Sequence, residues 1–271
     1  MPELSTIVSS RIFYRKMGVG PVMVLLHGFP ETGELWHNIW DALSVSFTLI
    51  IPDLPGSGAS RLEKETSISM MAETVKAILD KEEINSAILA GHSMGGYVAL
   101  AFAGLYPAMV EGVSLVHSMP VADDDEKKKA RIKSVELIEK GGKEPFIRQM
   151  IPNLFSDVFK QNNPAIVKEH IDKGLKMNSD SLINFYNAMR LREDRRNMVK
   201  AAKFPIQWII GLGDNIMGYK KILIESHQSA INFVTFYHEC GHMSMIEAPG
   251  KLTADLETFG KYSHHFFHAG V

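Results

Sequence analysis

The sequence has a single cysteine, Cys240, among its 271 residues. One cysteine cannot form an internal disulfide, and such low cysteine content fits a reducing compartment, so we expect a cytoplasmic protein. There is also no uninterrupted apolar run of about 18 residues, and the first residues lack the apolar core of a secretory signal. The sequence therefore predicts neither a membrane span nor a secretory signal.

The chain also lacks a strong charge of either sign. Its 29 Lys and Arg residues against 31 Asp and Glu residues give a net charge of −2 and a pI of about 6.6. This balance argues against general binding of nucleic acid or of an anionic membrane. Hydrophobic residues make up 45% of the chain, which is enough for a sizeable core without disulfides.

Short apolar runs alternate with helix-like segments along most of the chain. The runs expected to form buried strands are 22–26, 47–51, 87–90, 113–116, 205–210 and 233–237. Helical spacing is found over 33–44, 68–79 and 94–105, and a last helix is expected after Ser244. Because continuous apolar runs suit strands covered on both faces, the alternation predicts an α/β fold with a mostly parallel central sheet flanked by helices. The stretch from Thr6 to Tyr14 is expected to add antiparallel strands at the edge.

Residues 118–203 break this alternation. They contain no expected strand, and helical patterns recur, for example over 130–138 and 181–189. We therefore expect an inserted helical cap at 118–203, with one core formed by 1–117 and 204–271. The segment holds 18 Lys and Arg and 13 Asp and Glu, a net charge of +5, which leaves −7 for the rest. We interpret this charge as a solvated surface rather than a device that steers substrate, and the opposite signs also favour docking of the two parts.

The segment Gly91-His92-Ser93-Met94-Gly95 is a G-x-S-x-G motif. It lies between an expected strand and an expected helix, where a nucleophile elbow belongs. In such an elbow the serine sits on a tight, strained turn that exposes its hydroxyl, and the strand and helix nearly collide. Glycines at 91, 95 and 96 leave room for that approach, whereas an ordinary glycine-rich turn is the alternative interpretation.

A serine hydroxyl needs a base to take its proton, and the base needs an acid to hold its tautomer. His242, on a loop after the expected strand 233–237, is the candidate base. Asp214 directly follows the expected strand 205–210 and is the candidate acid. Because all three residues follow strands, we expect Ser93, Asp214 and His242 to meet at the carboxyl edge of the sheet.

Acyl transfer also requires donors for a developing oxyanion. The backbone N–H of Met94, directly after the serine, is one candidate. The second should come from the loop after the first buried strand, and we assign it to the N–H of Phe29, since Pro30 has none. His27 on the same loop is interpreted as a structural hydrogen-bonding residue.

These segments together resemble an α/β-hydrolase of the Ser-His-Asp esterase, lactonase and haloperoxidase-like branch with a helical cap. The matching segments are HGFP, DLPGSGAS, GHSMGG, GLGDN and GHMSMIEAP, which span residues 27 to 249 in the order of the family. The resemblance implies the fold, the Ser-Asp-His triad and a cap at 118–203. Related epoxide hydrolases and haloalkane dehalogenases use aspartate as the nucleophile, so Ser93 argues against both. The resemblance does not specify a substrate.

The sequence also carries a zinc-protease pattern, H-E-x-x-H, from His238 to His242. That pattern binds zinc only on a helix, where both imidazoles share one face. Here an expected strand runs into it and Gly241 interrupts any helix, so we expect no metal there. No role is assigned to Cys240.

Two further patterns have structural interpretations. Gly56-Ser57-Gly58 begins like a dinucleotide fingerprint, but Arg61 stands where the third glycine should be. We therefore expect a turn with positive φ beside a structural Asp53, and no cofactor. The histidines at 264, 265 and 268 are interpreted as a solvated tail, and the acidic run 123–125 as a solvated surface rather than a rival catalytic acid.

The sequence thus predicts a serine hydrolase that cleaves carboxylic esters, lactones or thioesters of small apolar acyl groups with water. Its pocket is expected to be apolar, formed by Phe29, Met119, Met217 and Met243 and covered by the cap. Two alternatives keep the same triad, a C–C bond hydrolase and a haloperoxidase-like perhydrolase. A non-enzymatic receptor for a small ligand is the alternative of another class. The sequence leaves open whether the chain is a monomer or a homo-oligomer.

Overall fold

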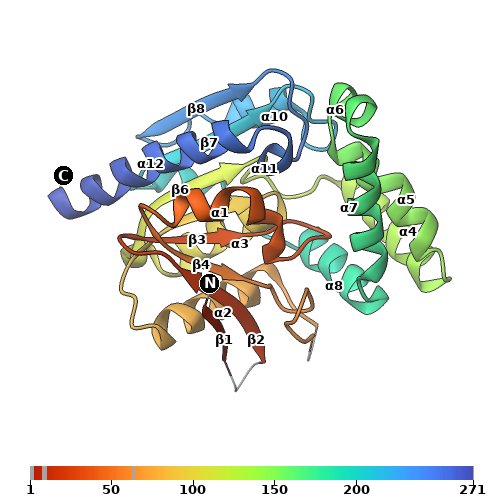
Figure 1. The fold of residues 1–271 in the computed structure, drawn as a ribbon, viewed down its shortest axis with the longest axis horizontal. Helices are drawn as coiled ribbons and strands as arrows, with labels where there is room; N and C mark the ends of the chain where they lie inside the picture. Colours follow the sequence, from red (N-terminus) through yellow and green to blue (C-terminus); the bar gives the residue numbers. More distant parts are fainter. Residues whose placement is uncertain (1–2, 8–10, 63–64, 271) are drawn as a thin grey trace.

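The computed structural model describes residues 3–7, 11–62 and 65–270. Its strands form one eight-stranded sheet in the order β1-β2-β4-β3-β5-β6-β7-β8 (Figure 1). All neighbours from β4 to β8 pair in parallel, and β1 and β2 are antiparallel at one edge. The strands are β1 (Glu3–Ile7), β2 (Ile12–Met17), β3 (Val22–Leu26), β4 (Thr48–Pro52), β5 (Ala87–His92), β6 (Val110–Val116), β7 (Ile206–Gly211) and β8 (Asn232–Tyr237).

This architecture confirms the predicted α/β fold. The expected antiparallel edge is also found, although residues 8–10 of that stretch lie outside the described residues. Every residue of β5 and of β6 is buried, because helices cover both faces of the sheet. On one face α2 (Ile68–Lys81) packs against α3 (Met94–Leu105), and on the other α1 (His37–Leu43) packs against α12 (Pro249–Ala269). The expected helix over 33–44 is divided, since a 3₁₀ turn at Gly33–Trp36 precedes α1.

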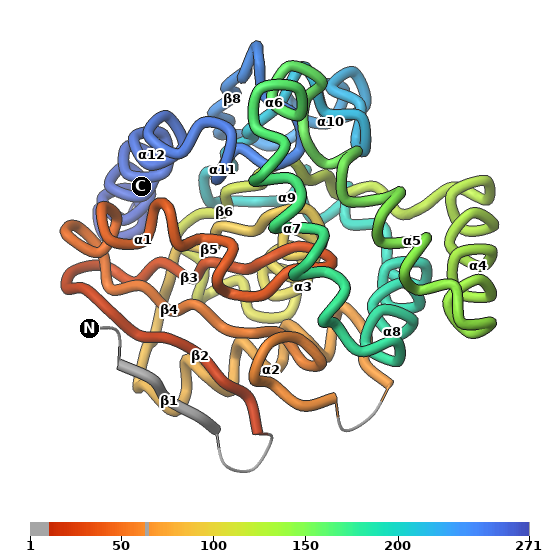
Figure 2. Tube along the Cα trace, turned by 45° about the vertical axis from the view of Figure 1, so that its right-hand side comes forward, coloured from red at the N-terminus to blue at the C-terminus, as the bar shows by residue number. Residues whose placement is uncertain are grey.

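The described residues between β6 and β7 contain helices and no strand, as predicted. The elements are α4 (Asp125–Glu139), α5 (Lys143–Met150), a 3₁₀ turn (Ile151–Leu154), α6 (Asp157–Asn162), α7 (Pro164–Lys176), α8 (Ser179–Arg190) and α9 (Arg196–Ala201). Figures 1 and 2 show α4 to α8 gathered on one side of the molecule, beyond one end of the sheet. We propose that residues 118–203 form a cap domain.

The first acid of this segment is buried, which corrects the expectation of a solvated acidic run. Oδ2 of Asp123 accepts a hydrogen bond from Arg131 at 2.5 Å, and Oδ1 lies 2.8 Å from Arg192. Burial would raise the pKa of Asp123, but the two guanidinium groups lower it below its usual range. Asp123 therefore links the start of the segment to its end, and Asp124 and Asp125 alone are exposed.

The C-terminal histidines also differ from the prediction. They lie on α12, whose buried residues include Leu252, Leu256 and Phe259, so this part of the chain is a packed helix and not a solvated tail. His265 is exposed, whereas His264 contacts the sheet. No helix within the described residues is both long and apolar enough to cross a lipid bilayer.

Candidate active site

Ser93 occupies a strained turn between β5 and α3. Its φ of +50° and ψ of −112° lie in a region that non-glycine residues rarely adopt. A Cβ atom on Gly91 would lie 2.3 Å from the carbonyl oxygen of Gly95, and one on Gly95 would lie 2.2 Å from that of Leu26. The two motif glycines are therefore required by the close approach of strand and helix, as the sequence predicted.

The neighbouring strand end holds this turn in place. The N–H of Ser93 donates to the carbonyl oxygen of Val116 at 3.0 Å, and the hydroxyl of Ser118 donates to the carbonyl oxygen of Ser93 at 2.7 Å. Residues at and just past the end of β6 thus fix the backbone of a residue just past β5, which pre-organises the position of the Ser93 side chain.

Asp214 and His242 form a buried pair. Nδ1 of His242 lies 2.7 Å from Oδ2 of Asp214, and both side chains are almost fully buried. The other carboxylate oxygen accepts the backbone N–H groups of Ile216 and Met217 at 2.8 and 3.0 Å. Burial would raise the pKa of Asp214, but the neighbouring imidazoles, His242 above all, hold it well below its usual range. The carboxylate is therefore ionised at neutral pH.

Two further histidines lie at this site, and the sequence analysis did not assign either of them. Nε2 of His92 lies 2.9 Å from the carbonyl oxygen of His242, and Nδ1 of His117 lies 3.6 Å from Oδ2 of Asp214. Burial lowers the pKa of His117 and lowers that of His92 well below the usual value, so both imidazoles are neutral near pH 7. Their position in the sequence could have indicated both histidines, because His92 ends β5 and His117 directly follows β6.

The buried pair is arranged for hydrogen bonding rather than for holding a metal ion. His117, Asp214 and His242 place one ligand atom each within 4.8 Å of the others. Their side chains are at most 1% exposed, however, so neither an ion nor the water that would complete its coordination has a route in.

The H-E-x-x-H segment is not helical, in agreement with the interpretation of the sequence. β8 ends at Tyr237 and the next helix, α11 (Ser244–Glu247), begins after the pattern. His238 is exposed whereas His242 is buried, so the two imidazoles do not share a helix face. Cys240 is a free, buried cysteine, and burial raises the pKa of its thiol.

The structural interpretation of His27 is confirmed. Its Nδ1 donates to the carbonyl oxygen of Gly28 at 2.8 Å, and its Nε2 accepts the N–H of Leu54 at 3.0 Å. Ser57 contacts the same Nε2 at 2.9 Å. His27 therefore joins the loop after β3 to the turn after β4.

Asp53 has the predicted structural role as well. Oδ1 accepts the N–H of Gly33 at 2.8 Å and Oδ2 accepts that of Ala59 at 2.9 Å. Gly56 and Gly58 have φ values of +90° and +51°, as expected for the turn. A Cβ atom on Gly58 would lie 2.0 Å from Oδ2 of Asp53, so the carboxylate needs this glycine beside it.

Phe29, the candidate oxyanion donor, lies under the inserted helices. Its ring packs against those of Phe146, Phe185 and Tyr186 at centroid distances of 6.4, 6.2 and 4.7 Å. Within the described part of the chain, no hydrogen bond from the N–H of Phe29 or of Met94 to another protein atom is found. The two groups are therefore free to donate to a bound molecule.

The four predicted pocket residues are not all at one cavity. Met119 and Met217 line a hollow of about 420 Å³ together with charged residues such as Lys127. The hydroxyl of Tyr97 lies 3.9 Å from the sulfur of Met217. Met243 and Phe29 are buried and line none of the described cavities.

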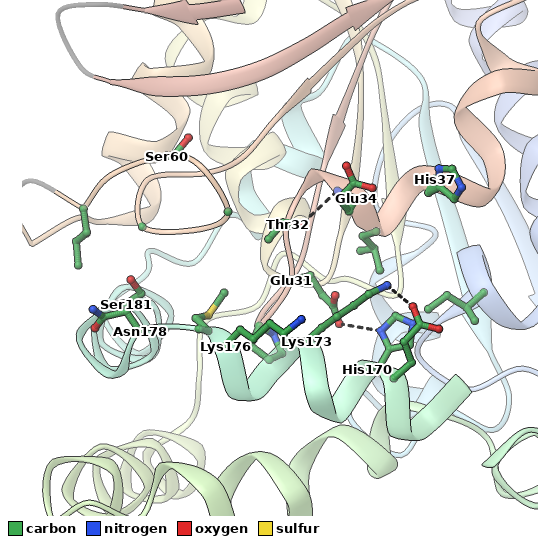
Figure 3. A pocket seen from close by; sticks show the side chains of 18 of the residues that line it. Glu31, Thr32, Glu34, His37, Ser60, His170, Lys173, Lys176, Asn178 and Ser181 are labelled. Carbon is green, nitrogen blue, oxygen red and sulfur yellow. Dashed lines mark hydrogen bonds and ion pairs between the residues drawn. The ribbon is translucent and has the colours of Figure 1, made fainter. Parts of the chain in front are cut away.

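A wider cavity of about 840 Å³ lies between the loop after β3 and helix α7 (Figure 3). Its lining includes Glu31 and Lys173, and it contains none of Ser93, Asp214 and His242. Glu31 lies 3.8 Å from Nδ1 of His170, which connects α7 to the loop that carries Phe29. The cavity is thus adjacent to the candidate oxyanion loop but contains none of the three candidate catalytic residues.

Sequence comparison supports the family assignment. Residues 21–150 match the family model described as the alpha/beta hydrolase fold. A pimeloyl-acyl-carrier-protein methyl ester esterase of Pseudoalteromonas atlantica is 25% identical over 262 residues, covering 89% of this chain and 95% of that protein. The chain spans only 27% to 41% of the length of several other curated relatives that it matches.

Solved structures show the same fold over almost the whole chain. An esterase from Thermogutta terrifontis aligns with a TM-score of 0.89 at 24% identity, covering 97% of this chain and 99% of that one. An enol-lactonase from Burkholderia xenovorans aligns with a TM-score of 0.86 at 20% identity, covering 95% and 99%. At these identities the likeness concerns the fold. The match over residues 21–150 and the shared architecture together show that this chain has the α/β-hydrolase fold.

Proposed function

We propose that the chain is a serine hydrolase that cleaves carboxylic esters, lactones or thioesters of small apolar acyl groups. The observation that carries the proposal is the buried 2.7 Å contact between His242 and Asp214, which follow β8 and β7 at the carboxyl edge of the sheet, the edge at which the strained Ser93 turn follows β5. This is the set of groups that a nucleophile, a base and an orienting acid require.

In the proposed mechanism the hydroxyl of Ser93 attacks the carbonyl carbon of the substrate. Nε2 of His242 accepts the hydroxyl proton, because Nδ1 carries its proton toward Asp214. The tetrahedral intermediate collapses as His242 protonates the leaving alcohol, thiol or, in a lactone, the ring oxygen. Water then attacks the acyl-enzyme by the same route and regenerates Ser93.

The N–H groups of Phe29 and Met94 are the proposed oxyanion hole. Met94 is the first residue of α3, so its N–H has no partner within the helix and points with the positive end of the helix dipole. Both donors are backbone groups on rigid segments, and such pre-organised donors stabilise the charge that develops on the substrate oxygen.

The proposed acyl pocket is apolar and lies under the inserted helices. The aromatic cluster around Phe29 supplies an apolar wall, and Met119, Met217 and Met243 are proposed as further contacts. A site of this kind fits a small apolar acyl group. The esterase and lactonase names of the similar proteins support the same substrate class for this chain.

The test is a chain-length series of p-nitrophenyl esters together with lactones, using purified wild type and Ser93→Ala. We expect hydrolysis by the wild type, a preference for short acyl chains, and loss of activity in Ser93→Ala with an unchanged melting temperature. A fluorophosphonate probe should label the wild type alone. Labelling that persists in Ser93→Ala would contradict the assignment of the nucleophile.

The same experiment separates the alternatives. Vinylogous diketones and a peroxide-dependent assay added to the panel would reveal C–C cleavage or perhydrolysis as the better reaction. Tight binding of a small molecule with negligible turnover of every substrate would instead favour a receptor.

A further inference from the structure

A second cluster of ligand-type side chains lies far from the triad, where α12 crosses the sheet. Glu111 is the second residue of β6, and His264 and His268 are one turn apart near the end of α12. Nδ1 of His264 lies 2.8 Å from Oε2 of Glu111, and Nε2 of His268 lies 3.8 Å from Oε1. All three ligand atoms lie within 4.8 Å of one another.

The close packing of α12 on β6 positions this cluster. A Cβ atom on Gly112 would lie 2.4 Å from the hydroxyl oxygen of Ser263, so the glycine next to Glu111 lets the helix approach the strand. His264 directly follows Ser263 and His268 comes four residues later, so both imidazoles reach the same face of the helix and the same carboxylate.

The spacing of the ligand atoms fits a metal ion. Nitrogen and oxygen ligands lie about 2.1 Å from a tetrahedral zinc ion and therefore about 3.4 Å from one another. The contacts of 2.8 and 3.8 Å bracket that value, so small rotations of the exposed imidazoles would bring both to an ion.

The carboxylate is buried and held in one orientation. Glu111 is 2% exposed, and Oε1 accepts a hydrogen bond from the hydroxyl of Ser86 at 2.6 Å. This is the outer contact that metal-binding carboxylates commonly have. Among the described residues, its ion-pair partners within 4 Å are the two histidines alone. A divalent ion would supply the full counter-charge that a buried carboxylate requires.

The two imidazoles leave the cluster open to solvent. The side chains of His264 and His268 are 37% and 54% exposed, so an ion has a route in and water can fill its remaining coordination positions. Two imidazoles and one carboxylate are a ligand set for zinc, nickel or copper rather than for calcium or magnesium, which prefer oxygen ligands.

We propose that Glu111, His264 and His268 bind one divalent transition-metal ion, with Zn²⁺ as the reference ion, and that the ion fastens the C-terminal helix to the sheet. Five residues of β6 follow Glu111 toward the triad end of the strand, a distance of about 17 Å. Figure 1 shows the end of α12 on the side opposite the inserted helices. The ion therefore stabilises the fold and takes no part in the proposed hydrolysis.

The test is calorimetric titration of ZnCl₂ into the full-length, untagged chain after treatment with EDTA and dialysis, together with thermal melts. The variants are His268→Ala, Glu111→Gln and the matched control His265→Ala, which removes an exposed histidine beside the cluster. We expect one zinc ion per wild-type chain and a higher melting temperature in its presence. His265→Ala should behave like the wild type.

His268→Ala should bind this ion at least about tenfold more weakly and lose the zinc-dependent rise in melting temperature. Glu111→Gln should do the same. If this buried substitution prevents folding, the exposed His268→Ala still tests whether the cluster binds the ion. A wild type without stoichiometric binding would show that the three residues form only an ion-pair cluster. Equal binding by wild type and His268→Ala would place the ion elsewhere and overturn the proposal.

Discussion

Nδ1 of His242 lies 2.7 Å from Oδ2 of Asp214, although the two residues come from loops after different strands. The backbone of His242 is fixed from the other side, since its N–H donates to the carbonyl oxygen of Leu154 at 2.7 Å. Leu154 belongs to the inserted segment. The candidate base is thus oriented by an acid of the sheet edge and by the helices that lie over it.

We predict that Asp214→Asn lowers kcat for ester hydrolysis by about 10⁴-fold, because an amide at this position favours the wrong tautomer of His242. KM should change little, and the variant should remain folded. Steady-state kinetics and a thermal melt check both points. Asp255→Asn, at a partly exposed site on α12, is the control and should retain activity. Full activity of Asp214→Asn would exclude Asp214 as the orienting acid.

Gly95→Ala should destabilise the fold. The added methyl group would meet the carbonyl oxygen of Leu26 at 2.2 Å, a backbone atom that cannot move aside cheaply. Overpacking of this kind costs about 1–3 kcal/mol or more. Gly250→Ala is the matched control, because nothing lies within 4 Å of a Cβ atom there. Chemical denaturation measures the unfolding free energies of both variants. Equal values would show that the methyl group at position 95 does not collide with the backbone.

The buried histidines predict how stability depends on pH. Burial lowers the pKa of His92 in the folded state well below the value of about 6.5 expected in the unfolded chain. Between these two pKa values the unfolded state binds a proton that the folded state does not, so stability is fully present above about pH 6.5 and falls as the pH decreases. Each such histidine contributes up to about 1.4 kcal/mol per pH unit.

His92→Gln should therefore reduce the slope of the unfolding free energy against pH, by at most the contribution of one bound proton. Denaturant unfolding between about pH 4.5 and pH 7.5 gives the slope for the wild type and the variant. His265→Gln, which changes an exposed histidine, should keep the wild-type slope. A slope that is the same in His92→Gln and the wild type would mean that His92 is charged in the folded protein.

Asp123→Ala should weaken the connection between the two ends of the inserted segment. The substitution would leave Arg192, whose side chain is 4% exposed, without its buried counter-charge. Breaking a buried ion pair costs about 3–5 kcal/mol. The neighbouring Asp125→Ala removes an exposed carboxylate and should cost less than about 1 kcal/mol. Unfolding free energies of the two variants test the contrast, and similar losses would show that Asp123 has no special role.

Local sequence was enough to predict the sheet, its helices and the elbow. The helix expected over 94–105 has the same bounds in the structure, since small and apolar residues continue without interruption between the strained Ser93 turn and Tyr106. The alternation of strand and helix also predicted that residues following strands meet at one edge. Asp214 and His242 do so, 28 residues apart in the sequence.

What the tertiary structure alone decided are the contacts between polar residues that are distant in sequence. Asp123 was predicted to be solvated because its neighbours are charged. Its buried ion-pair partner, Arg192, lies far along the chain. His264 looked like part of a tail until Glu111, 153 residues earlier, was found beside it. Hydrophobic periodicity reports which face of an element is buried. It does not report which polar groups meet there, because their pairing depends on how whole elements pack.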